Sequence, residues 1–274
     1  MSVFTNHLIL TTSEKGGSGK STAAIALVDA LRFEGIPLAA YDGNVDVSSL
    51  YETLGTRDAT GQLSDAQDPL MGAFPYSVRD ESRTVLVDCL RQGYAHMVHD
   101  IAGGGLTDMQ RLFGDKPDSL YQFVRSIARF DTCAVFVHLL TPDISTVASV
   151  AKYLDITENL GDLGHHVRHI AMLNLQGNRS EAHFPHWYGY TDATGEEKGG
   201  KTRARLLAAG GAEMNLPAID ERTMALLKAQ KVPFTVGANM PEMSITDQSR
   251  LYNFTEDFSK ELTHEIRQIL GLAQ

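Results

Sequence analysis

The amino-acid sequence predicts an α/β fold, in which a single doubly wound and mostly parallel sheet carries helices on both faces. Three observations predict it. Short apolar runs alternate with segments of helical period, and a glycine-rich loop joins the first such pair. No linker or repeat divides the 274 residues, of which 43% are hydrophobic. We therefore expect one domain over residues 1–274.

Six short apolar runs, flanked by turn residues, predict the strands, at 8–12, 38–41, 96–101, 133–140, 167–174 and 214–219. Five segments with helical spacing predict helices, at 21–33, 81–91, 119–129, 144–159 and 221–229. Gly35 and Pro37 end the first of these helices.

Near the C-terminus, apolar residues recur every three or four positions and predict one continuous helix: Leu251, Phe254, Phe258, Leu262, Ile266 and Leu270. Packing of this stripe against the sheet is the favoured use. The alternative is a helix that lies on a membrane surface. Acidic residues outnumber basic ones on its polar face, whereas helices that bind anionic lipid are rich in lysine and arginine.

Residues 14–22, with the sequence EKGGSGKST, lie between the first apolar run and the first helix. In such a loop, consecutive backbone N–H groups and a helix N-terminus converge on an anion, and Lys20 adds a full positive charge. Ser21 is placed to put its hydroxyl on Mg²⁺. We therefore expect the loop to bind the phosphates of a nucleoside triphosphate through Gly16, Gly17, Ser18, Gly19, Lys20, Ser21 and Thr22.

The loop departs from the standard pattern G-x-x-x-x-G-K-[ST] at its start. Glu14 stands where that pattern has glycine, and Lys15 follows at once. In this respect the loop resembles the deviant Walker A signature of the ParA/MinD superfamily of ATPases. The resemblance implies that Lys15 reaches across a dimer to the partner's nucleotide, while Lys20 binds nucleotide in its own subunit. The alternative is that Lys15 is a solvated loop lysine.

A second segment, residues 195–202, fits the standard pattern letter for letter. No buried strand precedes it, and two adjacent glutamates would repel a triphosphate. We expect it not to bind phosphate.

The same resemblance assigns the residues after the second strand. ParA/MinD proteins usually carry D-x-D-x-Q there; the first aspartate helps to hold Mg²⁺ and the second orients the attacking water. Asp42 keeps the first role, Asn44 takes the second aspartate's place and Asp46 the glutamine's. Because an amide accepts no proton from water, we expect slow hydrolysis, replacement by Asp46, or a register displaced by two residues. An ordinary turn after the strand is the alternative.

The strand at 96–101 resembles the Walker B strand, whose aspartate, here Asp100, bonds the water shell of Mg²⁺. A carboxylate at the carboxyl end of a central parallel strand faces the same crevice as the phosphate loop. His99 is expected in the core or behind the residues that hold the ion, and not as a ligand. By resemblance, Asn174 recognises adenine through its amide, or else serves as a simple cap, and the loop from Pro217 to Asp220 closes over the base.

Composition excludes some classes. The net charge of −10 argues against a uniformly basic nucleic-acid surface. Residues 198–231 nevertheless hold seven basic and three acidic side chains, a net charge of +4, which is a solvated helix face or a patch for DNA or an acidic partner. No apolar stretch approaches a membrane span or a signal peptide, so we expect a cytoplasmic protein. Cys89 and Cys133 lie in apolar runs and are expected to be buried thiols.

Two loops remain open to interpretation. Residues 183–190 gather aromatic side chains, among them the sole tryptophan, as a partner-binding surface or a lid would. Histidines at 165–169 and 183–186 lack the carboxylates or cysteines that would complete a metal site.

The resemblance implies a function as an ATP-dependent dimer switch, in which ATP and Mg²⁺ are sandwiched between two subunits. Such a switch acts in partitioning, positioning or conjugal transfer of plasmid DNA or another large cargo, and its partners are DNA or a DNA-bound adaptor protein. Through an insertion at about 175–212, the chain resembles the plasmid TraL/StbB-type branch of the superfamily.

Two other classes are alternatives. One is an ATP-binding scaffold with little turnover, for which Asn44 is the reason. The other is a nitrogenase-reductase-like enzyme, which needs two cysteines after the Walker B strand to hold an iron–sulfur cluster. Cys89 precedes that strand, and Cys133 is expected in the core.

Overall fold

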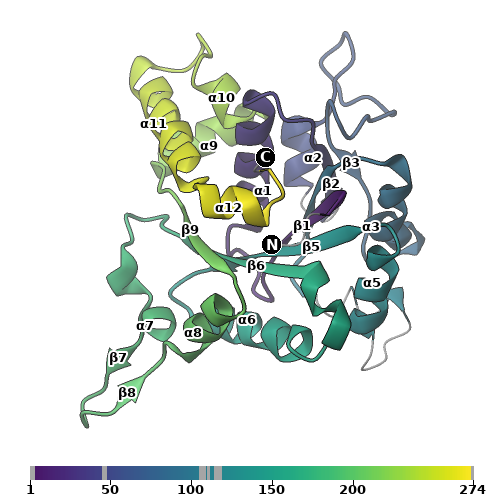
Figure 1. Cartoon of the computed structure of the whole chain (residues 1–274). Coiled ribbons are helices and arrows are strands. Elements are labelled where there is room, and N and C mark those ends of the chain that lie inside the picture. Colours follow the sequence, from purple (N-terminus) through teal and green to yellow (C-terminus); the bar gives the residue numbers. More distant parts are fainter. Residues whose placement is uncertain (1–3, 45–47, 105–108, 110–111, 114–118, 273–274) are drawn as a thin grey trace.

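A computed structural model describes residues 4–44, 48–104, 109, 112–113 and 119–272. These residues build one seven-stranded sheet with helices on both faces (Figure 1). The strand order is β3-β2-β4-β1-β5-β6-β9, and every neighbouring pair is parallel. The strands are β1 (Asn6–Thr12), β2 (Ala39–Gly43), β3 (Phe74–Pro75), β4 (His96–Ile101), β5 (Thr132–Leu140), β6 (Val167–Asn174) and β9 (Ala212–Leu216).

Two groups of helices cover the sheet. One face carries α1 (Lys20–Phe33), α2 (Ser49–Leu54), α9 (Glu221–Gln230), α10 (Phe234–Gly237), α11 (Ile245–Glu261) and α12 (His264–Ile269). The other face carries α3 (Val85–Asp88), α5 (Ser119–Ala128), α6 (Ile144–Thr157), α7 (Pro185–Tyr188) and α8 (Lys201–Ala208). Within β1, Ile9 packs on the first side, and Leu8 and Leu10 on the second, as the two-residue period of a strand requires. The predicted doubly wound fold is confirmed.

Two predicted helices are wrong in extent. Residues 81–91 form a 3₁₀ turn (Glu81–Thr84), one turn of α3 and a second 3₁₀ turn (Cys89–Gln92). The β-branched Thr84, Val85 and Val87 disfavour a long helix here, and Ser82 uses its hydroxyl to bind the neighbouring loop.

The predicted C-terminal helix is two helices. Leu262 leaves the helical conformation, and the Thr263 side chain then caps α12 by accepting from the Ile266 N–H at 3.3 Å. All six residues of the predicted apolar stripe are nevertheless buried in the core on the α1 side of the sheet. The stripe is packed inside the protein and is not available to a membrane surface.

The segment between β6 and β9 packs on the sheet and on α6 through a separate hydrophobic cluster. It contains a 3₁₀ turn (Glu181–His183), α7, a hairpin of β7 (Tyr190–Thr191) and β8 (Glu197–Lys198), and α8. Phe184 and Trp187 are 1% and 0% exposed and pack against α6, β6 and α8. The expectation that these two rings form a binding surface or lid is wrong, because they fill a core instead.

Candidate functional site

The loop between β1 and α1 has the backbone of an anion cradle. Gly17 and Gly19 have φ angles of 72° and 101°, which glycine adopts without strain, and Gly19 is the residue from which α1 starts. Lys20 is buried, its Nζ donates to the Lys15 carbonyl at 3.1 Å, and burial lowers its pKa. Among the residues described, the buried Ser18 hydroxyl finds no hydrogen-bond partner. The predicted strand, loop and helix are therefore present around buried polar groups.

Two carboxylates lie at the carboxyl end of the neighbouring strands. Asp42 of β2 and Asp100 of β4 are register partners, and both are fully buried. Asp42 accepts from the N–H groups of Asn44 and Tyr51 at 2.9 and 2.8 Å. Asp100 accepts from the Thr11 hydroxyl at 3.2 Å, whereas its Oδ2 has no partner among the described residues.

This pair is electrostatically unsatisfied. The pKa of Asp100 is raised to about 7, mainly by burial and next by the charge of Asp42. Hydrogen bonds from Ser21 and Thr11 and the charge of Lys20 oppose this rise. Burial also raises the pKa of Asp42. A divalent cation that prefers oxygen donors would relieve both carboxylates. The free Oδ2 of Asp100, the Ser21 hydroxyl and Asp42 therefore fit Mg²⁺, the ion that the sequence predicts.

A cleft of about 1140 Å³ opens beside the phosphate loop, and the buried Asp42 and Asp100 are not among the residues that line it. Of the predicted site residues it is lined by Gly16, Gly17, Gly19, Lys20, Ser21, Thr22, Asn44, Asn174 and Pro217. The walls also include Arg79, which the sequence analysis missed. It reaches the cleft from the loop after β3, a two-residue strand that carries no periodic signal of its own.

Lys15 does not point into the cleft of its own subunit. Its Nζ pairs with Asp143 Oδ2, and both side chains are about two-fifths exposed. Asp143 also caps α6 by accepting from the Ser145 N–H at 2.8 Å, and the bond from Lys15 holds the pKa of Asp143 below its usual range. The predicted contact of Lys15 with a second subunit stays a prediction, and in this structure the side chain is held by Asp143.

Asn44 lies where the second strand meets the cleft. It forms an isolated antiparallel bridge with Ser77. Asp46, the alternative water-activating residue, lies outside the described residues.

Asn174 lies beside the phosphate loop. Its Nδ2 donates to the Ser18 carbonyl and its Oδ1 accepts from the Gln176 N–H, both at 2.9 Å. A Cβ at Gly19 would come within 2.6 Å of the same Nδ2. Here the amide therefore both closes a turn, as the cap alternative expects, and supports the loop. Its predicted contact with adenine stays a prediction.

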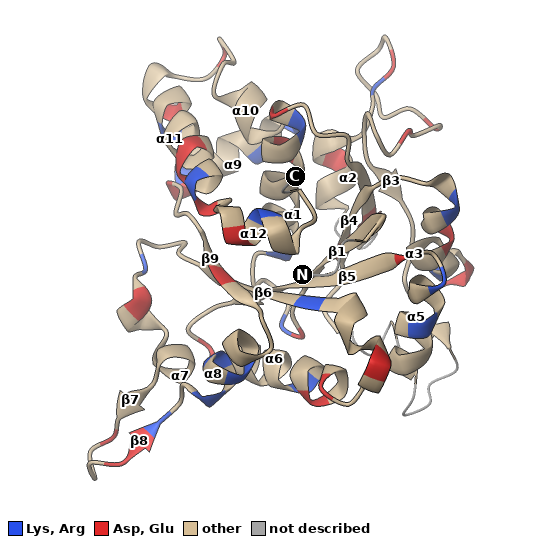
Figure 2. Cartoon of the chain, viewed as in Figure 1, with Lys and Arg blue, Asp and Glu red and all other residues tan. Residues whose placement is uncertain are grey.

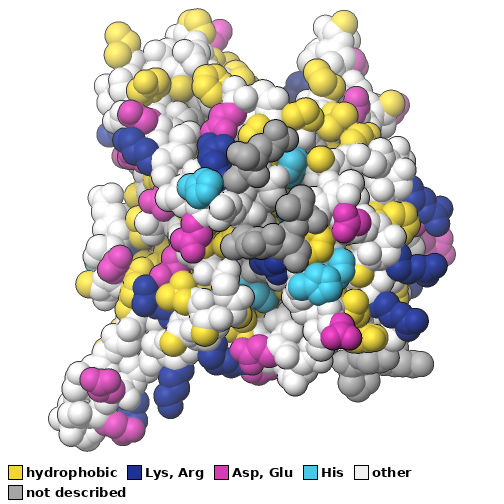
Figure 3. All heavy atoms as spheres, in the orientation of Figure 1, with side chains coloured by type: hydrophobic (Ala, Val, Ile, Leu, Met, Phe, Trp, Pro, Cys, Tyr) yellow, Lys and Arg dark blue, Asp and Glu magenta, His cyan; other side chains and the backbone are white. Residues whose placement is uncertain are grey.

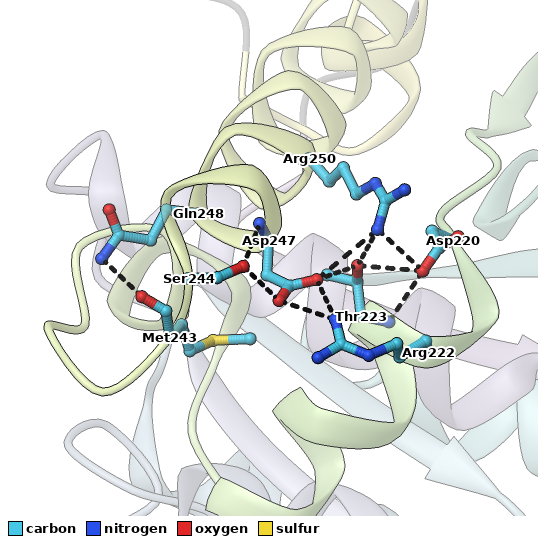
Figure 4. A network of polar contacts seen from close by, with 8 residues as sticks. All are labelled: Asp220, Arg222, Thr223, Met243, Ser244, Asp247, Gln248 and Arg250. Carbon is cyan, nitrogen blue, oxygen red and sulfur yellow. Dashed lines mark hydrogen bonds and ion pairs between the residues drawn. The ribbon is translucent and has the colours of Figure 1, made fainter.

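Pro217 follows β9 directly, and the strand stops there, short of the predicted 219, since proline has no N–H to continue the ladder. Asp220 lies outside the lining of the cleft. It caps α9 by accepting from the Thr223 N–H at 3.0 Å and pairs with Arg250 of α11. Figure 4 shows that Thr223 and Arg250 also contact the buried Asp247, the first by a hydrogen bond and the second by an ion pair. This network ties the loop after β9 to α11.

The second glycine-rich segment has different surroundings. A helix, α8, does begin at Lys201, but the strands before it are two-residue, largely exposed members of the β7–β8 hairpin. Lys198 pairs with Glu196 and Asp192. No buried strand end holds this loop, as the sequence analysis argued.

Most cations in the segment 198–231 are paired. Arg203 binds Glu213, Arg205 binds Asp155 and Glu158, and the others with ion pairs are Lys198, Arg222 and Lys231. Blue and red segments lie side by side on β8 in Figure 2, and positive and negative side chains are interspersed on the face of the molecule in Figure 3. This favours a solvated, ion-paired surface over a basic patch.

Buried histidines and cysteines serve the core. His99 stacks on Tyr41 and bonds the Tyr76 hydroxyl at 2.8 Å, as a core residue should. Among the residues described, no three His, Cys, Asp or Glu side chains lie close enough to hold a metal ion, and both Cys89 and Cys133 are buried free thiols. No described helix combines the length and apolarity needed to cross a bilayer.

One family model matches part of the chain. Residues 7–88 match the family model described as ATPase MipZ, which is ParA/MinD-like. No curated protein sequence matches the chain.

Similar solved structures include MinD of Aquifex aeolicus, with 15% identity over 93% of this chain and 97% of that one, and a TM-score of 0.46. Another is MinD with Mg-ADP from Pyrococcus horikoshii, with 14% identity, 95% and 98% coverage and a TM-score of 0.49. A ParA family ATPase from Chlorobium tepidum has 14% identity, 92% and 98% coverage and a TM-score of 0.46.

Proposed function

We propose that this chain is an ATP-dependent dimer switch of the ParA/MinD type, which its phosphate loop and its match to the ATPase family model over residues 7–88 support. ATP and Mg²⁺ bind in the cleft, two subunits enclose the nucleotide, and slow hydrolysis resets the dimer. The switch acts in partitioning or positioning of a large cargo, such as plasmid DNA. The plasmid TraL/StbB-type branch, and with it conjugal transfer, is the finer form of this proposal.

The observation that carries the proposal is that an anion cradle lies beside a buried pair of carboxylates at neighbouring strand ends. The cradle ends in Lys20 at the start of α1, and the pair is Asp42 with Asp100. A nucleoside triphosphate with Mg²⁺ brings phosphate anions to the cradle and a cation to the two carboxylates. In this proposal Ser21, Asp42 and Asp100 hold the ion, which neutralises charge on the phosphates.

The chain's own residues supply position and electrostatics. Lys20 and the loop N–H groups bind the phosphates, and Asn44 orients water without accepting its proton. Asn174 and Pro217 flank the base at the Gly19 end of the loop. Asp220 acts on this loop through its cap of α9 and its ion pair with Arg250.

The two lysines test the proposal. Lys20→Ala should abolish ATP binding, measured by titration calorimetry. Lys15→Ala should leave binding by the monomer intact and impair ATP-dependent dimerisation, measured by sedimentation. Equal loss of affinity in both variants would make Lys15 an ordinary loop contact and remove the deviant signature as support.

A scaffold that binds ATP with little turnover is the second candidate, and Asn44 favours it. A steady-state ATPase assay, with and without DNA, separates it from the switch. A scaffold shows no turnover in either condition. The switch shows slow turnover, which DNA or a DNA-bound adaptor stimulates.

A further inference from the structure

Arg79 is held in the cleft by contacts with the segment that follows β2. Before it, the Tyr76 N–H donates to the Asp42 carbonyl at 2.8 Å, and Ser77 bridges to Asn44. The Arg79 N–H then donates to the Ser77 hydroxyl at 3.1 Å. The position of Arg79 is therefore set by the same strand end that carries Asp42 and Asn44.

The loop that presents Arg79 is internally braced. Ser82 donates its N–H and hydroxyl to Asp80 Oδ1 at 2.7 and 2.6 Å, and its Oγ accepts from the Ser77 N–H at 2.8 Å. A braced loop presents a side chain at little further cost in conformational entropy. The Arg79 side chain is exposed toward the cleft, unlike the neighbouring Val78, which is buried.

The Arg79 guanidinium lies near the Gly16 end of the phosphate loop. Arg79 Nη2 lies 3.5 Å from the Gly103 carbonyl, in the turn after β4. Gly103 in turn touches the loop at Gly16, since a Cβ on Gly103 would lie 3.6 Å from the Gly16 nitrogen. Asn174 touches the opposite end, at Gly19.

We propose that Arg79 binds the terminal phosphate of ATP in its own subunit, an assignment that rests on the proposed function. If the base lies at the end of the phosphate loop that Asn174 contacts, the phosphate chain runs toward Gly16. The terminal phosphate then lies near Arg79. Two parallel N–H groups of a guanidinium match two phosphate oxygens, a geometry that lysine cannot reproduce. Contact with the last phosphate distinguishes ATP from ADP. When this phosphate is lost, the change at Arg79 reaches Asn44 through the bridge between Ser77 and Asn44.

The test compares the affinities of AMPPNP and ADP, each with Mg²⁺, by titration calorimetry at a protein concentration that keeps the chain monomeric. Arg79→Ala should raise the dissociation constant of AMPPNP about 10- to 100-fold, the usual loss for hydrogen bonds to a charged group. The ADP constant should stay within about twofold of wild type. Arg79→Lys should recover part of the AMPPNP affinity, because it keeps the charge and loses the fork.

Arg91→Ala is the matched control, since Arg91 is an exposed arginine that does not line the cleft. It should bind both nucleotides as wild type does. Lys20→Ala should lose both. Equal loss of AMPPNP and ADP in Arg79→Ala would overturn the assignment, as would wild-type affinity for both or a loss seen only once dimers form. If wild-type protein binds neither nucleotide, the proposed function itself fails.

Discussion

Asp100→Asn should remove a pH dependence from the stability of the nucleotide-free protein. The folded chain holds a proton on Asp100 up to a pKa of about 7, whereas the unfolded chain releases it near 3.8. Between these values the folded state binds more protons, so the free energy of unfolding falls as pH rises. The loss reaches its full size above pH 7. Below the unfolded pKa both states are protonated, and this contribution to stability is complete.

The magnitude follows from the two pKa values. One pKa unit corresponds to 1.36 kcal/mol, so the full span is about 4 kcal/mol at most. Part of that span lies below pH 5. Between pH 5 and pH 8 the wild-type protein should therefore lose about 3 kcal/mol from this group. Asparagine resembles the protonated carboxyl in shape and does not titrate, so the variant should lack this slope.

Urea unfolding at pH 5, 6, 7 and 8, without nucleotide or Mg²⁺, measures the effect. The stability of Asp100→Asn minus that of wild type should rise steadily with pH and level off near pH 8. Asp162→Asn, which replaces an exposed carboxyl in the 3₁₀ turn before β6, is the control and should parallel wild type. A constant difference between Asp100→Asn and wild type over this range would refute the reasoning.

Three further predictions concern the loops. Asp143→Ala should free Lys15 and shift ATP-dependent dimerisation to lower protein concentration in sedimentation, and an unchanged midpoint would mean that the ion pair exerts no restraint. Lys201→Ala should leave ATP affinity within about twofold of wild type in a calorimetric titration, and a loss of about tenfold or more, as for a charged contact, would identify the second glycine-rich loop as a phosphate site. Asn44→Asp should raise kcat in a steady-state ATPase assay; an unchanged kcat would move the water-activating role to Asp46.

The glycine-rich loop between β1 and α1 was predictable because its determinants are local. The run Leu8–Thr12, the glycines and the following helix lie within about thirty residues, and each has a pattern that sequence alone displays. Asp100 was predictable for a related reason, since β4 is a long buried strand and ends in the crevice. Its raised pKa, in contrast, depends first on burial in the folded sheet and then on the register that pairs it with Asp42.

Contacts between distant segments account for what the sequence analysis missed. Arg79 follows a two-residue strand, and contacts with the end of β2, among them the bridge between Ser77 and Asn44, bring it to the cleft. Phe184 and Trp187 carry no local sign of burial, because their partners come from α6, β6 and α8. The break at Leu262 depends on a capping threonine inside an otherwise regular apolar stripe.

The sole tryptophan gives this protein a built-in optical probe. Trp187 is wholly buried, and its indole N–H donates to Glu213 Oε1 of β9 at 2.6 Å. Glu213 also accepts both arms of the Arg203 guanidinium, which lies over the Tyr188 ring. The fluorescence emission of Trp187 therefore reports how the segment between β6 and β9 packs on the edge of the sheet. Trp187 does not line the cleft beside the phosphate loop. A red shift with unchanged far-ultraviolet circular dichroism marks detachment of that segment from an otherwise folded molecule.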